Sequence, residues 1–440
     1  MVVISRLGQY VNSMQDQCVH VWTKLSHLVD KTPRALITRA LLHIFDMKNS
    51  LYLFILLFGS FFSCERNKNN GVEQIYQIPV NPQGNIDLSF SDFFDTTLIV
   101  PLEVTPNSLI GEVSKVITTD EFIYVLDRTI AESLFVFDYQ GRLLNYFSGT
   151  GGGPSEYLRV SNFFISKDET TIFITDLSLG KILAFDQKGN FLFENKFVLG
   201  ENFADLITYQ NGFLIAKPTP DDLAVDLQYL DHNLKFVEVP FKLAENNFIM
   251  EAGNKHQFFY PGTGGVTYFK EVLSKNLYAI TPDDVQVYAF NLPEDQVFSP
   301  EALPWDNEKP KIHMGKVYSE IRERSLLNVG DQVLDLGSLV LINFHVGDRI
   351  NILAFNKTDK TAKVVKNFMN DLDGLVKNLP GLFPINYHAN EMIINLFPND
   401  IYAALGTSEE SNPYLDYLTK LMPQLEENPV LFIYRKKIQQ

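Results

Sequence analysis

The chain has few cysteines and a deficit of positive charge. Two of its 440 residues are cysteine, Cys18 and Cys64, so the part after residue 64 has neither a thiol nor an internal disulfide. That part must be stabilised by its core alone. Acidic residues outnumber basic ones by 53 to 37, for a formal net charge of -16. This sign is unsuited to holding a phosphate backbone, so nucleic acid is not an expected partner.

Motifs for catalysis and metal binding are also absent from the sequence. It contains no Gly-x-Ser-x-Gly, no His-Glu-x-x-His and no cysteine pair at zinc spacing. The histidines after residue 64 are His232, His256, His313, His345 and His388. None is spaced from another as zinc ligands are, although a triad assembled in space stays open. The sequence therefore predicts no catalytic residue, no metal site and no cofactor, with calcium as the one cofactor left open.

Residues 119–197 contain one pattern twice. Asp127 and Asp176 end matching apolar strands 49 positions apart, and the turns Asp138–Gly141 and Asp186–Gly189 recur after 48. Strands alternating in this way, with glycine where a tight turn requires positive φ, form hairpins. A period of about 40 to 50 residues built of short strands is typical of propeller blades.

Weaker copies of the pattern extend to the end of the chain. Strands are expected at 212–216, 227–231, 276–290, 339–345, 349–355 and 391–396, which together with the two clear copies suggests about six blades. Residues 316–325 and 412–422 instead have a helical period. The predicted fold class is therefore all-β, a six-bladed β-propeller over residues 73–440 with short helical insertions on one face of the disc.

The first 72 residues have a different composition. Residues 47–64 combine a basic start, an apolar run, small residues and Cys64, which are the parts of an export signal. Residues 65–72 form a polar, flexible tether. Residues 1–46 are interpreted as a non-native upstream extension, with an amphipathic leader as the alternative. For residues 47–64, an uncleaved anchor or a buried helix is the alternative.

The apolar run before Cys64 resembles a bacterial lipoprotein signal, in which this cysteine becomes the lipid attachment site. Residues 147–158, here called the glycine-rich hinge, carry Gly151, Gly153, Pro154, Glu156 and Tyr157 in the order of a Gly-x-Gly-Pro-Gly-Glu-Tyr motif. This motif resembles that of a six-bladed β-propeller family of bacterial lipoproteins related to NHL-repeat and TolB-like propellers. Ser155 stands where that family usually has glycine.

The resemblance has consequences for how the ring closes and for what the hinge does. It implies that an early strand, either Ile75–Ile78 or Thr97–Val100, completes the last blade beside Val430–Tyr434. It also suggests a structural hinge in which Glu156 accepts backbone N–H groups of a neighbouring strand and Tyr157 packs between blades. Phosphate binding is disfavoured because the Lys-Ser/Thr ending of a phosphate loop is missing.

Four residues remain as candidates for a ligand or channel site. Asp127 and Asp176 could ring a channel and bind calcium, although acids at strand ends more often fix turns. His345 and His388 lie in or beside expected strands and could face the channel. The expected function is a lipid-anchored, non-enzymatic binding or scaffold module of the cell envelope, at the outer membrane, with a protein, small molecule or glycan as partner. The alternative is a metal-dependent hydrolase or lyase of the lactonase kind.

Overall fold

The computed structural model describes most of the chain after residue 73. The described residues are 74–149, 151–196, 205–218, 225–231, 233, 235–237, 258–271, 273–298, 314–374, 390–406, 413–425 and 427–437. They all belong to one compact unit, Asn70–Gln440. The predicted extension, signal, tether and lipid attachment site, together with His388, lie outside the described residues.

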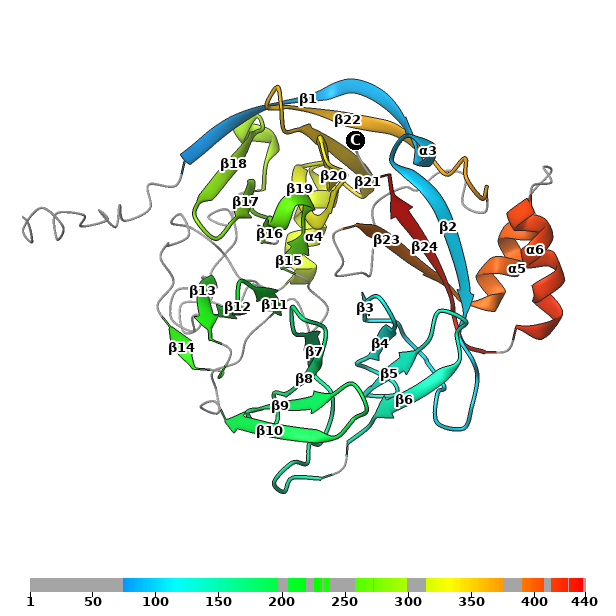
Figure 1. The fold of residues 1–440 in the computed structure, drawn as a ribbon. Coiled ribbons are helices and arrows are strands. Elements are labelled where there is room, and N and C mark those ends of the chain that lie inside the picture. Colours follow the sequence, from blue (N-terminus) through cyan, green and yellow to red (C-terminus); the bar gives the residue numbers. More distant parts are fainter. Residues whose placement is uncertain are drawn as a thin grey trace, which may run out of the picture. The chain divides into compact units, whose positions relative to one another are not determined.

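The described strands of this unit form six blades, two of which are joined into one nine-stranded sheet by β1 (Gln74–Ser89), so that the hydrogen-bonded sheets number five. Figure 1 shows the blades arranged around a common centre. Blade 1 consists of β3 (Lys115–Thr118), β4 (Ile123–Asp127), β5 (Ser133–Phe137) and β6 (Leu143–Phe147). Blade 2 consists of β7 (Asn162–Ile165), β8 (Thr171–Asp176), β9 (Lys181–Asp186) and β10 (Phe191–Lys196). Blade 3 consists of β11 (Asp205–Tyr209), β12 (Gly212–Pro218), β13 (Val225–Leu230) and β14 (Phe236–Val237).

The other three blades follow in chain order. Blade 4 consists of β15 (Phe259–Pro261), β16 (Thr267–Phe269), β17 (Asn276–Ile280) and β18 (Val285–Asn291). Blade 5 consists of β19 (Leu327–Asp335), β20 (Leu339–Val346), β21 (Arg349–Asn356) and β22 (Thr361–Met369). The described strands of blade 6 are β23 (Glu391–Leu396), β24 (Val430–Lys436) and β2 (Phe94–Pro101). The predicted all-β, six-bladed fold is confirmed.

Repeated turns account for the period seen in the sequence. The Oδ1 atom of Asp138 accepts hydrogen bonds from the backbone N–H groups two and four residues later, and Asp186 and Asp231 do the same. Gly141 and Gly189 have φ values of 80° and 83°, which favour a residue without Cβ. An Asp-capped turn thus joins the third and fourth strands of blades 1, 2 and 3.

Apolar clusters join every pair of neighbouring blades. Tyr124 and Phe163 lie between blades 1 and 2, whereas Phe164 and Phe213, with ring centroids 4.5 Å apart, lie between blades 2 and 3. Separate clusters join blade 3 to 4, 4 to 5, 5 to 6 and 6 to 1. Each fully buried large apolar side chain contributes about 1.5 to 3 kcal/mol. The six clusters therefore close the ring.

Strand β2 completes the last blade. It pairs antiparallel with β24, with Thr97 opposite Tyr434 and Val100 opposite Leu431. Of the two segments proposed for this role from the sequence, Thr97–Val100 is therefore the correct one. The pairing joins an early strand to the last strand of the chain and covers an edge that would otherwise be open to association.

Strand β1 (Gln74–Ser89) has a separate role as a belt. Its first part pairs in parallel with β18 of blade 4, and its second part pairs in parallel with β22 of blade 5. Figure 1 shows it passing along the outer edges of both blades. The alternative that Ile75–Ile78 pairs beside Val430–Tyr434 is wrong, because this segment pairs with β18.

Helices lie at both predicted insertions. They are α4 (Met314–Glu323) and α6 (Pro413–Leu421), and two helices that the sequence did not predict are α3 (Phe90–Phe93) and α5 (Pro398–Gly406). Among the described residues there are also three 3-10 turns, η1 (Thr263–Gly265), η2 (Glu294–Gln296) and η4 (Met422–Gln424). In the described part of the chain, no helix is both long and apolar enough to cross a membrane.

The helical insertions share one face of the ring. We call the face at which the innermost strands β3, β7, β11, β15 and β19 begin the start face, and the opposite one the end face. Helix α4 immediately precedes β19. Thr118, the last residue of β3, donates a hydrogen bond to Glu391, the first residue of β23, so β23 runs from the end face towards the start face. Helices α5 and α6 follow β23 and therefore also begin at the start face.

Candidate functional site at the start face

Three successive innermost strands begin with a buried polar residue. These residues are Lys115 of β3, Asn162 of β7 and Asp205 of β11. The Lys115 ammonium donates a hydrogen bond of 3.1 Å to Oδ1 of Asn162 and lies 5.4 Å from the centre of the Phe163 ring. Two blades thereby present a directly bonded lysine and amide at the start face.

Asp205 continues this row of buried polar side chains towards blade 4. Its Oδ2 atom accepts hydrogen bonds from the backbone N–H groups of Phe258, at 2.9 Å, and Phe259, at 3.0 Å. Its Oδ1 atom accepts one from Leu206 N–H. These bonds fix the carboxylate at the boundary between blades 3 and 4, where its negative charge also stabilises the charged form of Lys115.

Burial is the largest influence on the pKa of the Lys115 side chain. Loss of water lowers its pKa to about 7, against the opposing effect of Asp205, and the nearby charge of Arg128 lowers it further. Both the ammonium and the amine are therefore populated near neutral pH. The amine form can accept a hydrogen bond, which an ordinary charged lysine cannot do.

Blade 4 contributes a second buried pair, Lys270 and Glu271, directly after β16. The backbone N–H of Lys270 donates to Phe258 O at 2.9 Å, which places the pair beside the beginning of β15. The Lys270 ammonium donates to the main-chain oxygens of Glu271 at 2.6 Å and Ser274 at 2.5 Å. The Lys270 side chain is thus hydrogen-bonded to the backbone of the turn in which it lies.

Among the residues that the structure describes, neither oxygen of the buried Glu271 carboxyl group has a hydrogen-bond partner. Burial raises its pKa to about 8, against the stabilising charge of Lys270, and burial also lowers the pKa of Lys270 to about 8. Glu271 is therefore mostly a neutral acid at pH 7. A buried polar group without a partner is uncommon in native proteins and calls for an explanation such as a bound molecule.

Blade 5 places His345 at the same face. His345 lies in β20 opposite Asn328, the second residue of β19. Burial lowers its pKa and the charge of Asp331 opposes this shift, so the imidazole is neutral at neutral pH. The negative charge of Asp331 also acts to raise the pKa of Lys270, so Asp331 influences side chains of both blade 4 and blade 5.

Asp127 and Asp176, also proposed from the sequence, make the hydrogen bonds of turn-fixing residues. Each ends the second strand of its blade and accepts backbone N–H groups at both carboxylate oxygens. The donors to Asp127 are Gly111, Glu112, Thr129 and Ile130, and those to Asp176 are Leu158, Ser178 and Leu179. These bonds connect the loop before the innermost strand to the turn after the second strand.

The glycine-rich hinge is held by a hydrogen bond between two of its own residues and by packing against a neighbouring strand. Glu156 accepts a 2.7 Å hydrogen bond from Gly153 N–H, inside the hinge, where the sequence suggested a neighbouring strand as the donor. Tyr157 is buried between blades 1 and 2 and packs edge-on against Phe185. Ser155 has a φ of 59°, in the left-handed region, which explains why glycine suits this position.

Of the polar residues at the start face, His345 was a candidate from the sequence, whereas the others were not singled out. Lys115, Asn162 and Asp205 begin strands of four or five residues, too short to show a clear alternation. Lys115 and Asn162 are 47 positions apart, close to the repeat of 48 or 49, and this spacing is the one signal that could have linked them. Lys270 and Glu271 belong to a turn in a blade where the repeat is weak.

In the part of the chain that the structure describes, no cluster of side chains supports metal binding. Among those residues, no three His, Cys, Asp or Glu side chains are grouped so as to hold a metal ion. Calcium therefore stays an untested possibility from the sequence.

Comparison with solved structures finds chains of similar fold, and the first of the three described next has a TM-score above 0.5. A protein inferred to be exported, from Bacteroides fragilis, is 15% identical and aligns over 83% of this chain and 100% of that chain, with a TM-score of 0.59. A member of the DUF4221 family from Bacteroides vulgatus is 11% identical over 79% and 98%, with a TM-score of 0.47. An inactive virginiamycin B lyase from Staphylococcus aureus is 14% identical over 60% and 75%, with a TM-score of 0.35.

Sequence comparison identifies the family. The chain has no significant match among curated proteins. The sequence profile of a family described as a domain of unknown function, DUF4934, matches residues 75–435, which is nearly the whole described unit. The chain therefore belongs to the DUF4934 family.

Proposed function

We propose that the protein is a lipid-anchored binding module of the cell envelope whose ligand site is the polar arc at the start face. The observation that supports this proposal most strongly is the convergence of polar side chains from five successive blades. The arc comprises Lys115, Asn162, Asp205, Lys270, Glu271 and His345. A ring fold brings these residues together although they are spread over more than 200 positions of the chain.

The chemistry of the arc favours a hydroxyl-rich ligand such as a neutral oligosaccharide. Glu271 is mostly protonated at pH 7 and Lys115 is partly neutral, so the arc offers both donors and acceptors with little net charge. Hydroxyl groups donate and accept hydrogen bonds at once. A sugar hydroxyl beside Glu271 would give its carboxyl group the hydrogen-bond partner that no described residue provides.

Titration calorimetry with neutral trisaccharides on the full chain tests this proposal. We expect maltotriose, chitotriose or mannotriose to bind, and Glu271→Met, which keeps the side-chain volume and removes the hydrogen bonds, to weaken binding about tenfold. Glu121→Gln, at an exposed turn of blade 1, is the control and should bind as the native protein does. Equal affinity of the Glu271→Met variant and the native chain would contradict the proposed site.

Metal analysis of the purified full chain separates binding from metal-dependent catalysis. A binding module is expected to contain less than one calcium or zinc ion per chain. A stoichiometric metal that is lost together with an esterase or lyase activity on chelation would replace the binding role with the hydrolase or lyase alternative.

The lipid anchor is tested at Cys64. We expect the mature chain to begin at this residue and to carry a diacylglyceryl group, which mass spectrometry of its N-terminal peptide detects. Cys64→Ala should abolish the modification and release the protein from the membrane fraction. A native chain that keeps an unmodified Cys64 would refute the anchor and leave the ligand site untouched.

A further inference from the structure

Three large apolar side chains are exposed in neighbouring loops of the start face. They are Leu109 in the loop before β3, Ile130 in the turn between β4 and β5, and Leu158 in the loop before β7, and we call them the apolar ridge. Leu109 and Leu158 are each 52% exposed, and Ile130 is 67% exposed. Single exposed apolar residues are common on protein surfaces, whereas a contiguous group often marks a binding site.

The first two members of the apolar ridge are adjacent. The Ile130 side chain lies directly over Gly111, two residues after Leu109, so that a Cβ at position 111 would be 2.6 Å from Ile130 Cδ1. The buried Asp127 carboxylate fixes both loops, because it accepts hydrogen bonds from Gly111 N–H at 2.8 Å and from Ile130 N–H at 2.9 Å. These two side chains are therefore held in a defined place beside each other.

The third member is bonded to the same turn from blade 2. Val160 N–H donates a 3.4 Å hydrogen bond to the main-chain oxygen of Glu132, at the end of the turn between β4 and β5. The Glu132 carboxylate also pairs with the Arg159 guanidinium at 3.6 Å. Leu158 N–H donates at 2.6 Å to the buried carboxylate of Asp176. The apolar ridge thus belongs to loops that hydrogen bonds hold in place.

The apolar ridge adjoins the polar arc. Gly111 precedes Lys115 by four residues and Leu158 precedes Asn162 by four, a length of chain that spans at most about 14 Å. The turn between β4 and β5 also donates a backbone hydrogen bond of 3.2 Å to Oγ of Ser114, directly before Lys115. The loops that carry the apolar ridge therefore lead directly into the lysine and the amide of the arc.

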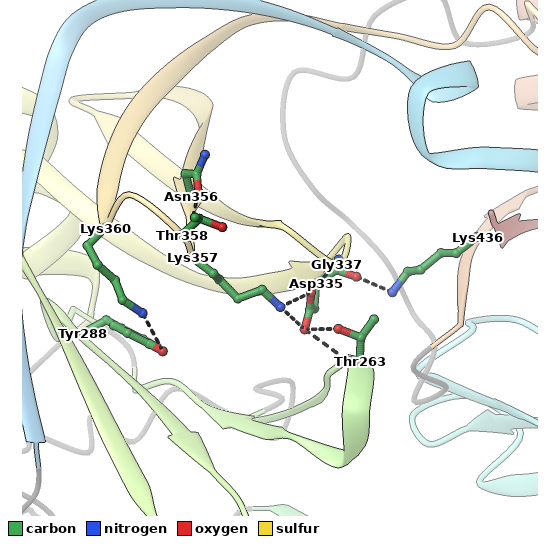
Figure 2. A network of polar contacts seen from close by, with 9 residues as sticks. All are labelled: Thr263, Tyr288, Asp335, Gly337, Asn356, Lys357, Thr358, Lys360 and Lys436. Carbon is green, nitrogen blue, oxygen red and sulfur yellow. Dashed lines mark hydrogen bonds and ion pairs between the residues drawn. The ribbon is translucent and has the colours of Figure 1, made fainter. Parts of the chain in front are cut away.

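The polar groups at the end face of blade 5 are, by contrast, bonded to one another. Figure 2 shows Lys357 and Thr263 reaching the carboxylate of Asp335, at the end of β19. Lys357 donates to its two oxygens at 3.0 and 3.1 Å, and Gly337 N–H donates to Oδ1 at 2.8 Å. This network calls for no ligand, so the start face is the side that combines exposed apolar residues with a buried acid that no described residue bonds.

The size of the apolar ridge suits a small apolar group. At 52% to 67% exposure, its three side chains present roughly 300 Å² of surface in all. A stable protein interface needs about 800 Å² from each partner, so the apolar ridge is too small to hold a second copy of the chain. It is large enough to cover one face of an aromatic ring or a short alkyl chain.

From this arrangement we propose that the apolar ridge is a subsite for an apolar group carried by the ligand of the polar arc. The ligand class is then a glycan with an apolar aglycone, whose hydroxyl groups lie at the arc and whose aglycone covers Ile130 and Leu158. This inference rests on the proposed function, because the arc holds the sugar. Covering the apolar ridge removes apolar surface of both protein and ligand from water.

Titration calorimetry of the full chain with maltotriose, chitotriose and mannotriose, each beside its phenyl glycoside, tests the subsite. We expect the phenyl group to strengthen binding about tenfold. Leu158→Ser should bind the phenyl glycoside little more tightly than the plain trisaccharide. Leu144→Ser, at a leucine of β6 that is 50% exposed and lies outside the apolar ridge, is the matched control and should keep the native gain.

The outcomes separate this inference from the proposed function. Trisaccharide binding without a gain from the phenyl group would overturn the subsite and leave the polar arc standing. An equal loss of the gain in Leu158→Ser and Leu144→Ser would also overturn it, because it would indicate a general effect of apolar surface. Phenyl glycoside binding that is weakened in Leu158→Ser but not in Glu271→Met would support the subsite and contradict the arc. Binding of none of these compounds would refute both.

Hexyl glycosides of the same trisaccharides distinguish two kinds of aglycone. A larger gain from the hexyl chain than from the phenyl ring assigns the subsite to the alkyl chain of a glycolipid. A larger gain from the phenyl ring assigns it to an aromatic glycoside.

Discussion

Replacement of Glu271 by glutamine should make the protein markedly less sensitive to pH. Burial raises the pKa of Glu271 to about 8, whereas a carboxyl group in the unfolded chain titrates near its ordinary value of 4.5. Between these values the folded state holds a proton that the unfolded state has released. The stabilising proton is fully effective below pH 4.5, and its contribution is lost as the pH rises from 4.5 to 8.

The size of the expected effect on stability follows from the difference between the two pKa values of Glu271. At about 1.4 kcal/mol per pH unit, ionisation of Glu271 in the unfolded chain lowers the free energy of unfolding by about 3 kcal/mol at pH 7 and by about 4 kcal/mol at pH 8. Glutamine does not ionise and has nearly the same shape. For a unit of this size, about 3 kcal/mol corresponds to a shift of about 4 °C in the melting temperature.

Thermal unfolding of the native chain and the Glu271→Gln variant at pH 5, 6, 7 and 8 measures this effect. We expect the two melting temperatures to be closest at pH 5 and to diverge steadily up to pH 8, with the variant more stable. The other carboxyl groups are present in both proteins, so their contributions cancel in the difference between the two melting temperatures. Glu121→Gln, at an exposed position, should follow the native curve. Parallel curves for the native chain and Glu271→Gln would refute the buried neutral acid.

Two further predictions concern the ring itself. Ser155→Gly should raise the free energy of unfolding by about 0.5 to 1 kcal/mol in a denaturant titration, because it removes a left-handed strain, whereas Ser155→Ala should not. A Ser155→Gly variant no more stable than Ser155→Ala would contradict this. Deletion of residues 428–440 removes β24 and leaves β2 unpaired, so we expect a lower melting temperature and aggregation; a soluble product with an unchanged transition would refute closure through β2.

The blades were predictable where local chemistry repeats. Strands β4, β5, β8 and β9 are short runs of apolar residues, and β5 and β9 end in turns that an aspartate and a glycine shape, so the sequence repeat and the hydrogen bonding agree. The innermost strands were not predicted. Strands such as β15, with three residues, are too short to set a pattern, and their position depends on packing between blades rather than on local preference.

The belt, and the residues of the polar arc other than His345, could not be predicted from the sequence for a different reason. Strand β1 pairs with β18 and β22, more than 200 residues away, and its composition does not distinguish this edge from that of blade 6. In the same way, Asp205 gains its role from the backbone N–H groups of Phe258 and Phe259, and these contacts exist only once blades 3 and 4 are adjacent. Asp127 and Asp176 attracted notice because they repeat, and that repetition reflects a shared turn.

The proposal that the polar arc binds a hydroxyl-rich ligand is tested most directly by crystals of the full chain soaked with the trisaccharide that binds most tightly. Our account predicts sugar density at the start face, with a hydroxyl within hydrogen-bond distance of the Glu271 carboxyl group. Sugar density found solely at the end face or along the outer strands, with Glu271 still unpartnered, would contradict it.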